Sequence, residues 1–370
     1  MKISAKTEDL VEALQTSSRI ASARSAIQAL AGVQIEAGDA GIELQATDQE
    51  LSIQMPLAGE VQEAGSVVLP ARLLLDVVRQ LPGDSVAIAL TSGGSGQEVE
   101  VVSGTANFHL RTLRSEDFPE LPAKEGGAEV QMPSEEFVAT INRVARAASR
   151  DETRPILTGV LVSVEGDRLR MVATDSYRLS LKETGLPSSL PEAFEANIPA
   201  RALEELSRLA ADATDPISVA VSDNQAVFGV GDTAFSTRLI DGQFPNFQQL
   251  LPDEFEHELR INTEEFLSTA RRISLLAQKN APLRLAFKEG ELTISAQTPD
   301  VGEASETMPV PFAGEPMEIG FNPEYLLAGL ESAESEDVLL RLISPLRPGL
   351  IVSGDDSGFL YLIMPIRLNV

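Results

Sequence analysis

The chain has 370 residues, of which 43% are hydrophobic, and it contains neither cysteine nor tryptophan. The absence of cysteine excludes disulfides, thiolate zinc sites and a cysteine nucleophile. The 29 basic and 56 acidic residues give a net charge of −27, which by itself argues against nucleic acid, because phosphate binding needs clustered Lys and Arg. No apolar run reaches the roughly 18 residues of a membrane span, and the first residues lack the apolar core of a signal peptide, so we expect a soluble, cytoplasmic protein.

The first third of the chain is predicted to begin with a strand and a helix. Lys2 to Lys6 alternate, Thr7 is the expected N-cap, and Glu8 and Asp9 fall in the first turn of a helix that continues to Ile20. Period-two patterns and an apolar stripe then predict further strands, a second helix and a linker. The strands centre on Val33–Ile35, Ile42–Ala46, Leu51–Met55, Val86–Leu90, Val99–Val102 and Asn107–Thr112, the helix is Pro70–Leu81, and the linker is Ser115–Glu125.

The opening pattern occurs three times, at Lys2–Leu14, Glu129–Ser149 and Glu258–Ala270. Each copy is an alternating run, then Ser or Thr, two acids and an apolar residue, and aligning Leu10, Phe137 and Phe266 gives spacings of 127 and 129 residues. A second helix recurs as Asn197–Ala210 and Asn322–Leu330, and alternating strands recur around both. The sequence therefore predicts an α+β protein of three tandem domains, 1–125, 126–253 and 254–370, each with two helices packed on antiparallel sheets.

Twelve of the 29 basic residues lie in or at the ends of the first five predicted helices: Arg19, Arg24, Arg72, Arg79, Arg143, Arg146, Arg150, Arg201, Arg208, Arg271, Arg272 and Lys279. Arg143, Arg146 and Arg150 are spaced i, i+3 and i+7, which places them on one face of a helix. In a single helix such residues would be read as partners of the helix dipole or of an i,i+4 acid. Their recurrence in five helices of an acidic chain indicates one shared basic surface, able to follow phosphates without reading bases.

The sequence contains no recognisable catalytic constellation. Its two histidines, His109 and His257, lack metal-ligand company, and there is no P-loop or Gly-x-Ser-x-Gly elbow. The Gly93–Gly96 run is read as a hairpin tip. We therefore expect no catalytic residue, metal or cofactor, and an enzyme with an unrecognised site is the least favoured alternative.

The three copies, together with Ala173–Leu179, Asp241–Pro245 and Met364–Leu368, closely resemble the bacterial DNA polymerase III beta subunit family, the sliding clamps, over essentially the whole chain. The resemblance implies a non-catalytic processivity factor, a DNA sliding clamp that forms a head-to-tail dimer whose six domains close a ring around duplex DNA. Helices would line the hole, so the ring could be basic inside and acidic outside. The resemblance also implies that short apolar peptides of the replicative polymerase, the clamp loader and repair proteins dock between the second and third domains. A triplicated peptide-binding scaffold that does not encircle DNA is the alternative.

The resemblance assigns roles residue by residue. Arg24 matches a DNA-facing arginine, and the other DNA-binding candidates by position are Arg72, Arg79, Arg143, Arg146, Arg150, Arg201, Arg208, Arg271, Arg272 and Lys279. The implied peptide pocket comprises Leu157, Thr174, Ser176, Tyr177, Arg178, Leu179, Pro245, Leu250, Leu362, Met364, Pro365 and Ile366, and the implied dimer interface includes Phe108 and Leu275. From the pattern alone, Leu179, Leu362 and Met364 could equally be strand core residues.

Two places depart from the family pattern. The loop Arg150–Ile156 departs, at Asp151, Pro155 and Ile156, from members that have polar or aromatic DNA-contacting residues there. Gln249 stands where some members have a basic residue. We therefore do not carry the family's DNA contact over to that loop, and we expect the peptide preference to differ.

Overall fold

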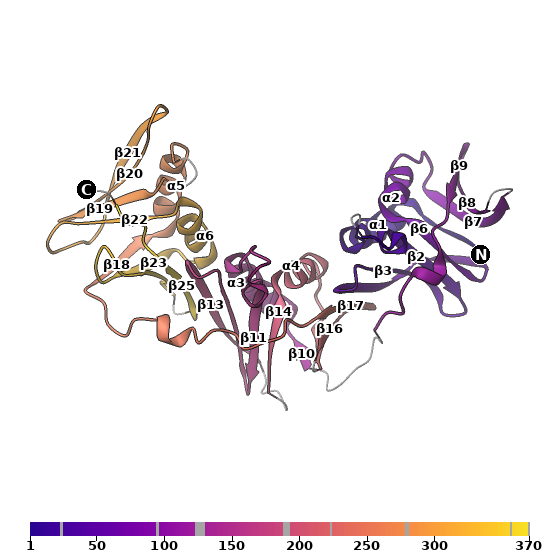
Figure 1. Cartoon of the computed structure of the whole chain (residues 1–370), viewed down its shortest axis with the longest axis horizontal. Coiled ribbons are helices and arrows are strands. Elements are labelled where there is room, and N and C mark those ends of the chain that lie inside the picture. The colour runs from indigo at the N-terminus through magenta and orange to yellow at the C-terminus, as the bar shows by residue number, and fades with distance from the viewer. Residues whose placement is uncertain are drawn as a thin grey trace. The chain divides into compact units, whose positions relative to one another are not determined.

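The computed structural model describes residues 1–22, 25–93, 96–122, 130–187, 193–222, 224–277, 281–355 and 357–368. Within these ranges the chain forms six α-helices and four sheets in which every strand pairing is antiparallel (Figure 1). The helices are α1 (Thr7–Ile20), α2 (Ala71–Arg79), α3 (Ser134–Val144), α4 (Ala200–Leu209), α5 (Thr263–Ser274) and α6 (Pro323–Ala333). None of these described helices is long and apolar enough to cross a membrane. The prediction of paired helices on antiparallel sheets is confirmed.

The chain divides into two compact units, which we describe separately. Unit 1 comprises Met1–Ser134 and Arg208–Leu239, and unit 2 comprises Glu135–Ser207 and Ile240–Val370. The strands of the middle repeat are therefore shared between the two units, because some of them pair with strands of the first repeat and others with strands of the third.

Unit 1 contains two sheets. In spatial order, sheet A is β5 (Gly59–Glu63), β1 (Lys2–Lys6), β7 (Ser85–Gly93), β8 (Gly96–Ser103) and β9 (Ala106–Arg111). Sheet B is β10 (Val130–Met132), β15 (Ile217–Val221), β16 (Gln225–Val230), β17 (Thr233–Arg238), β4 (Leu51–Leu57), β3 (Gly41–Thr47), β2 (Gly32–Gly38) and β6 (Gly65–Pro70). Pairing of β17 with β4, which sets Phe235 opposite Ile53, joins the middle repeat to the first.

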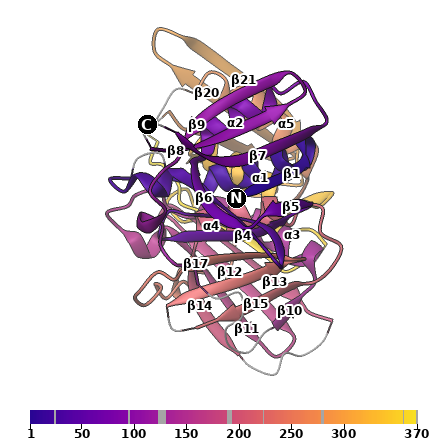
Figure 2. The same cartoon turned by 90° about the vertical axis from the view of Figure 1, so that its right-hand side faces the viewer.

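The helices α1 and α2 lie side by side in unit 1 and fill the space beside its sheets (Figure 2). The helix α1 contacts β2, β3 and β4 of sheet B and also β1 of sheet A. Its apolar stripe, which includes Leu10, Leu14 and Ile20, is fully buried, as are Leu74 and Val78 of α2. The core of unit 1 therefore lies between these two helices and the sheets, as the helical periodicity predicts.

Unit 2 also contains two sheets. Sheet C is β14 (Phe194–Pro199), β11 (Gly159–Glu165), β12 (Arg168–Thr174), β13 (Arg178–Gly185), β25 (Phe359–Ile363), β24 (Gly349–Ser353), β23 (Asp337–Leu342) and β18 (His257–Asn262). Sheet D is β21 (Gly302–Pro309), β20 (Glu291–Thr298), β19 (Leu283–Lys288) and β22 (Met317–Phe321). Sheet C becomes continuous across the middle and third repeats where β13 pairs with β25. The helix α6 packs on β24 and β25 and lies beside α5.

A repeated hairpin turn supports the triplication independently of the helices. Gln49, Ser176 and Asp300 all have positive φ, at +77°, +81° and +64°, and each lies two residues after the threonine that ends its strand. The three turns join β3 to β4, β12 to β13 and β20 to β21. Because left-handed backbone is uncommon for residues other than glycine, its recurrence at the same place indicates a shared ancestral hairpin.

Two details of the predicted helices are wrong. Lys6, and not Thr7, is the N-cap of α1, and the Thr7 hydroxyl instead donates to the Gly83 carbonyl at 2.6 Å. The third predicted helix ends at Val144 and is followed by the 3-10 turn η3 (Ala145–Ala147), so Arg150 does not share a helical face with Arg143. The cause is tertiary: the Ser149 N–H donates to the Leu157 carbonyl at 2.8 Å instead of continuing the helix.

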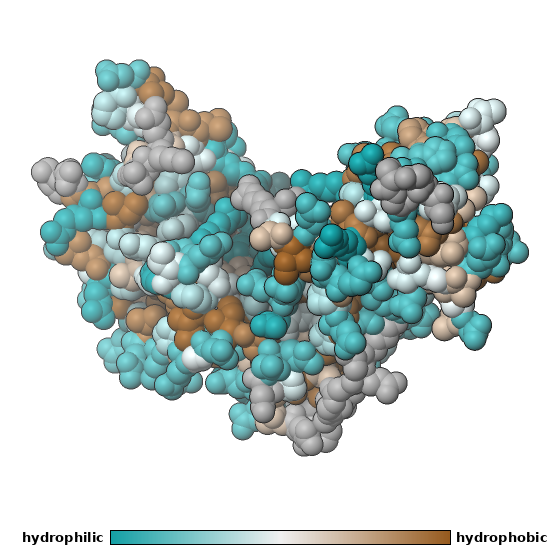
Figure 3. Space-filling model, turned by 45° about the vertical axis from the view of Figure 1, so that its right-hand side comes forward, coloured by the Kyte–Doolittle hydropathy of each residue, from teal (hydrophilic) through white to brown (hydrophobic). Residues whose placement is uncertain are grey.

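The hydrophilic surface agrees with the large number of charged residues in the sequence. On the face seen in Figure 3, hydrophilic residues predominate and hydrophobic ones gather only in small groups. The expected linker Ser115–Glu125 begins with the 3-10 turn η2 (Ser115–Asp117), and its last three residues lie outside the described ranges, as do Gly94 and Ser95 of the expected hairpin tip.

Candidate partner-binding pocket and basic helices

The hairpin turn between β12 and β13 is held by its own side chains. The Thr174 hydroxyl donates to the Arg178 carbonyl at 2.6 Å and accepts from the Ser176 N–H at 3.2 Å. Asp175 Oδ1 accepts from the N–H groups of Tyr177 and Arg178, both at 2.9 Å. These bonds offset the strain of Ser176, whose positive φ costs about 1–3 kcal/mol. The turn is therefore rigid, and it forms one side of the site described below.

The floor beside this turn is built where the middle and third repeats meet in sheet C. Leu179 of β13 lies opposite Leu362 of β25, and the Met364 N–H donates to the Tyr177 carbonyl at 2.8 Å. Both leucines are buried in one apolar cluster, which also includes the buried side chains of Leu161, Val172, Phe244, Phe247 and Leu350. The reading of Leu179 and Leu362 as strand core residues is therefore correct, and the same side chains also face a cavity.

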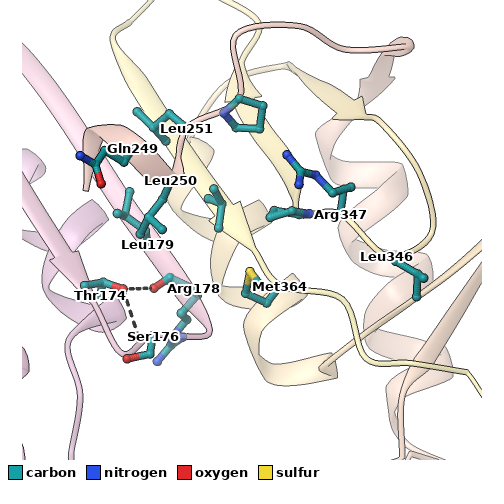
Figure 4. Close-up of a pocket in the computed structure, with 13 residues that line it drawn as sticks. Thr174, Ser176, Arg178, Leu179, Gln249, Leu250, Leu251, Leu346, Arg347 and Met364 are labelled. Carbon is teal, nitrogen blue, oxygen red and sulfur yellow. Dashed lines mark hydrogen bonds between the residues drawn. The ribbon is translucent and has the colours of Figure 1, made fainter. Parts of the chain in front are cut away.

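That cavity has a volume of about 390 Å³ and lies entirely within unit 2 (Figure 4). It is lined by Thr174, Ser176, Arg178, Leu179, Gln249, Leu250, Leu251, Pro252, Leu346, Arg347, Pro348, Leu362 and Met364. The floor is buried, whereas the rim residues Leu250, Leu346 and Met364 are 51%, 62% and 40% exposed. Exposed apolar side chains gathered around a cavity of this size are typical of a site for apolar ligand groups.

Arg178 in this cavity already has partners within the protein. Its Nε lies 3.0 Å from Asp175 Oδ2, and its guanidinium lies 4.4 Å from the centre of the Tyr325 ring. Although burial alone lowers it, neighbouring groups that include the Asp175 carboxylate hold the pKa of Arg178 above its ordinary value. Burial also raises the pKa of the Tyr361 hydroxyl, so that group stays neutral. Arg178 is therefore an oriented donor whose charge is balanced by Asp175.

Arg347 is the other cation of the lining. It is exposed on the loop between β23 and β24, in a turn where its N–H donates to the Ser344 carbonyl at 3.2 Å. The structure gives its guanidinium no ion pair with any described residue. A third arginine, Arg154, reaches the edge of the site, but its Nε is bonded to Asp151 at 2.9 Å and its Nη1 to Ser176 at 3.0 Å. Arg347 is thus the cation best placed to meet a ligand carboxylate.

The structure brings together seven of the twelve residues proposed for this pocket: Thr174, Ser176, Arg178, Leu179, Leu250, Leu362 and Met364. The other five do not line it. Leu157 is buried, whereas Tyr177 and Pro245 are exposed outside the cavity. Pro365 follows the lining residue Met364, and Ile366 lines a second cavity of about 990 Å³ against sheet D. Leu251, Pro252, Leu346, Arg347 and Pro348 were missed. The only sequence signal for the last three was an apolar residue, Leu346, in the proline-bounded run Pro345–Pro348.

The basic helix residues differ in their surroundings. Arg72 and Arg79 are exposed on α2, and no ion pair joins Arg72 to Asp76, although both residues are described. Arg201 and Arg208 are exposed on α4, and Arg150 is exposed beyond η3. Arg24 and Lys279 lie outside the described residues.

Four arginines of α3, η3 and α5 are paired with glutamates of the third repeat. Arg143 Nη2 lies 2.8 Å from Glu334, and only 13% of the Arg143 side chain is exposed. Arg146 and Arg271 both reach Glu331, at 2.9 and 2.7 Å. Arg272 reaches Glu306 in β21 at 2.5 Å. The sixth helix, which has no basic residue, thus supplies Glu331, and Glu334 follows at its C-cap.

The two residues proposed for a dimer interface are exposed apolar groups. Phe108 lies in β9, the edge strand of sheet A, and is 39% exposed. Leu275 follows α5 and is 84% exposed, the largest value among the exposed large hydrophobic residues described. Within the described residues, no group of three or more histidine, aspartate or glutamate side chains is placed to hold a metal ion.

Comparison with known proteins matches the chain from end to end. Models of the N-terminal, central and C-terminal domains of the DNA polymerase III beta subunit match residues 1–122, 131–246 and 248–367. The chain is 33% identical over 383 residues to the beta sliding clamp of Streptomyces coelicolor, covering 100% of both chains.

Solved structures agree with these sequence matches. The crystal structure of the DNA polymerase sliding clamp from Bacillus subtilis is similar with a TM-score of 0.92 at 31% identity, over 100% of both chains. That of the sliding clamp from Pseudomonas aeruginosa bound to griselimycin is similar with a TM-score of 0.90 at 26% identity, again over 100% of both.

Proposed function

The chain belongs to the DNA polymerase III beta subunit family, the beta sliding clamps, and we propose that it encircles duplex DNA as a ring dimer and tethers replication proteins to it. It is a non-catalytic processivity factor. The observation that carries this function is the match of all three beta-subunit domains, in order, along the full chain. The same matches support the division into domains 1–125, 126–253 and 254–370.

A ring explains how a chain of net charge −27 can hold DNA. Topological linkage replaces tight binding, so a few screened phosphate contacts on the inner wall suffice while the outer surface stays acidic. The exposed arginines Arg72, Arg79, Arg201 and Arg208 support a phosphate-facing role for α2 and α4. Arg24, Arg150 and Lys279 remain candidates by position, and Arg143 is the weakest because its side chain is mostly buried.

Two free strand edges support ring closure between two copies. The strand β9 is one edge of sheet A, and β21 is one edge of sheet D, so each has backbone groups available for a partner strand. The exposed side chains of Phe108 and Leu275 would be covered in the two equivalent joints of the dimer.

The pocket beside the Thr174–Arg178 turn is proposed to receive a short peptide from the replicative polymerase, the clamp loader or a repair protein. Its buried apolar floor and exposed apolar rim suit one or two apolar anchors. Arg347 adds a preference for a carboxylate beside those anchors, because Arg178 is already paired with Asp175. A protein that acts on the bacterial chromosome in this way is proposed to be cytoplasmic.

Retention on circular DNA tests the function. The protein is assembled on a nicked circular duplex by its cognate clamp loader and ATP, and the circle is then linearised with a restriction enzyme. A clamp stays bound to the circle in gel filtration and is lost after linearisation. Equal retention on both forms, or none on the circle, would favour the alternative of a peptide-binding scaffold.

Molecular mass in solution tests the ring. Light scattering is expected to give the mass of two chains, and Leu275→Asp is expected to give one, because a carboxylate would be buried in each joint. A wild-type monomer would contradict ring closure.

A further inference from the structure

Glu331 of α6 is held between two arginines that come from different repeats. Its Oε2 accepts from Arg146 Nη1 at 2.9 Å, and its Oε1 accepts from Arg271 Nη2 at 2.7 Å. Arg146 lies in η3, directly after α3, and Arg271 lies in the last turn of α5. One carboxylate thus uses one oxygen for each guanidinium, and the three side chains together carry a net charge of +1.

All three side chains are open to solvent. The side chains of Arg146, Arg271 and Glu331 are 40%, 55% and 36% exposed. Exposed ion pairs of this kind contribute little to stability and exchange easily with other anions. The neighbouring pair is different, because the Arg143 side chain is only 13% exposed and its Nε and Nη2 both bind one oxygen of Glu334, at 2.9 and 2.8 Å. The site at Glu331 is therefore exchangeable, whereas Arg143 with Glu334 is a fixed contact.

We propose that Arg146 and Arg271 form a phosphate-binding site for the DNA backbone, and that Glu331 occupies this site in the free protein. A phosphodiester shares one negative charge between two oxygens at a spacing similar to that of a carboxylate, and guanidinium groups bind both kinds of anion through the same donor geometry. DNA would displace the Glu331 side chain, and both guanidinium groups would then bind the phosphate that replaces it. The proposal rests on the proposed function, since it concerns the inner wall of the ring.

The consequence is a contact with DNA that is weaker than two unpaired arginines would make. Each phosphate that displaces Glu331 must break two existing ion pairs, so the free energy gained from Arg146 and Arg271 is smaller than for two unpaired arginines. The number of net phosphate contacts sets how steeply affinity falls with salt. Glu331 therefore lowers both the affinity and its salt dependence, which keeps a ring of this kind mobile along the duplex.

The variant Glu331→Gln, which removes the negative charge and keeps the shape of the side chain, tests the proposal in the full chain. Fluorescence anisotropy of a short labelled duplex is measured with wild type and variant between about 50 and about 200 mM salt. We expect Glu331→Gln to bind about 3- to 10-fold more tightly at the lower salt, and the slope of log K against log salt to steepen by about one to two.

A matched control separates this effect from a general change in charge. Glu324 lies two turns earlier on the same face of α6, about 10 Å away along the helix, and is exposed. The structure gives its carboxylate no arginine partner among the described residues. Glu324→Gln removes the same charge and should leave the affinity within a factor of two of wild type and the slope unchanged. Equal gains from Glu324→Gln and Glu331→Gln would overturn the proposal.

A second set of variants addresses a role of Glu331 in folding alone. If Glu331 only braces α6 against η3 and α5, Glu331→Gln lowers the thermal unfolding temperature and leaves the salt slope unchanged, which also overturns the proposal. The gain from Glu331→Gln should disappear in the double variants with Arg146→Gln or Arg271→Gln, whereas either arginine change alone should have a smaller effect in the wild-type background. Wild-type retention on circular DNA with an unchanged Glu331→Gln slope would refute this inference and leave the clamp function standing; absence of retention would refute the function itself.

Discussion

Replacing Leu250 with alanine tests the pocket with the least disturbance to the fold. Leu250 ends the 3-10 turn η5 (Gln248–Leu250) and stands at the rim of the cavity with 51% of its surface exposed. Leu250 does not belong to the buried apolar cluster under the cavity. Its truncation should therefore change the free energy of unfolding by no more than about 0.5 kcal/mol. Leu179→Ala would be a poor test, because that side chain is buried and its loss costs about 2–5 kcal/mol of stability.

The expected loss of affinity follows from the surface that a ligand would cover. The truncation removes three carbon atoms, each worth about 0.8 kcal/mol when fully buried. Because about half of the Leu250 surface is exposed before binding, covering that exposed half contributes about 1.2 kcal/mol. The dissociation constant should therefore rise about 5- to 10-fold.

The assay is fluorescence anisotropy with a labelled peptide from the tail of the replicative polymerase. Leu73→Ala is the matched control, because Leu73 is 48% exposed on α2 and does not line the cavity. It should bind the peptide as wild type does. A Leu250→Ala protein with unchanged unfolding temperature and a dissociation constant within twofold of wild type would show that the peptide's apolar anchor does not sit in this cavity.

Three further predictions concern charge and packing in unit 2. Arg347→Gln should abolish a several-fold preference for a peptide carrying Asp over one carrying Asn beside the apolar anchor, whereas Arg154→Gln should retain it. Loss of this preference in both variants would show that it comes from the overall positive charge around the pocket and not from Arg347. Gly329→Ala should destabilise the protein by about 1–3 kcal/mol in chemical denaturation, because its Cβ would lie 2.6 Å from Tyr361 Cδ1, whereas Gly185→Ala meets nothing within 4 Å and should be near neutral. Hydrogen bonds from Arg272 hold the pKa of Glu306 below its ordinary value of 4.5, so carboxyl NMR titration should find a lowered value that returns toward 4.5 in Arg272→Gln. Because this pKa is depressed in the folded state, the stabilisation from the pair is present above the unfolded pKa and is lost as the pH falls through the folded one.

Local patterns determined the elements of this protein and their repetition. Apolar stripes placed α1 and α2 within a few residues of their observed bounds, and alternation placed most of the strands, because both signals depend on neighbours a few positions apart. The edge strand β5 was missed for the same reason: four of its five residues are exposed, so it has no alternation to detect. It forms because Val61 pairs with Ile3, which is a tertiary contact.

The functional surfaces depended on pairings between distant parts of the chain. Sequence and family resemblance together named seven lining residues, but Leu346 and Arg347 join them only because β13 pairs with β25 and brings the third repeat beside the second. The arginine spacing similarly predicted a basic helix face, which the early end of α3 interrupts.

The sequence by itself determined the three-fold repetition, the helix and strand types and the positions of the basic residues. Only the tertiary structure decided which of those charges are available, because Glu331 lies 185 positions from Arg146 and 60 from Arg271 and yet binds both. Charge is a property of the residue and can be counted along a chain. Its neutralisation is a property of the fold, since an ion pair needs two side chains within about 4 Å whatever their separation in sequence.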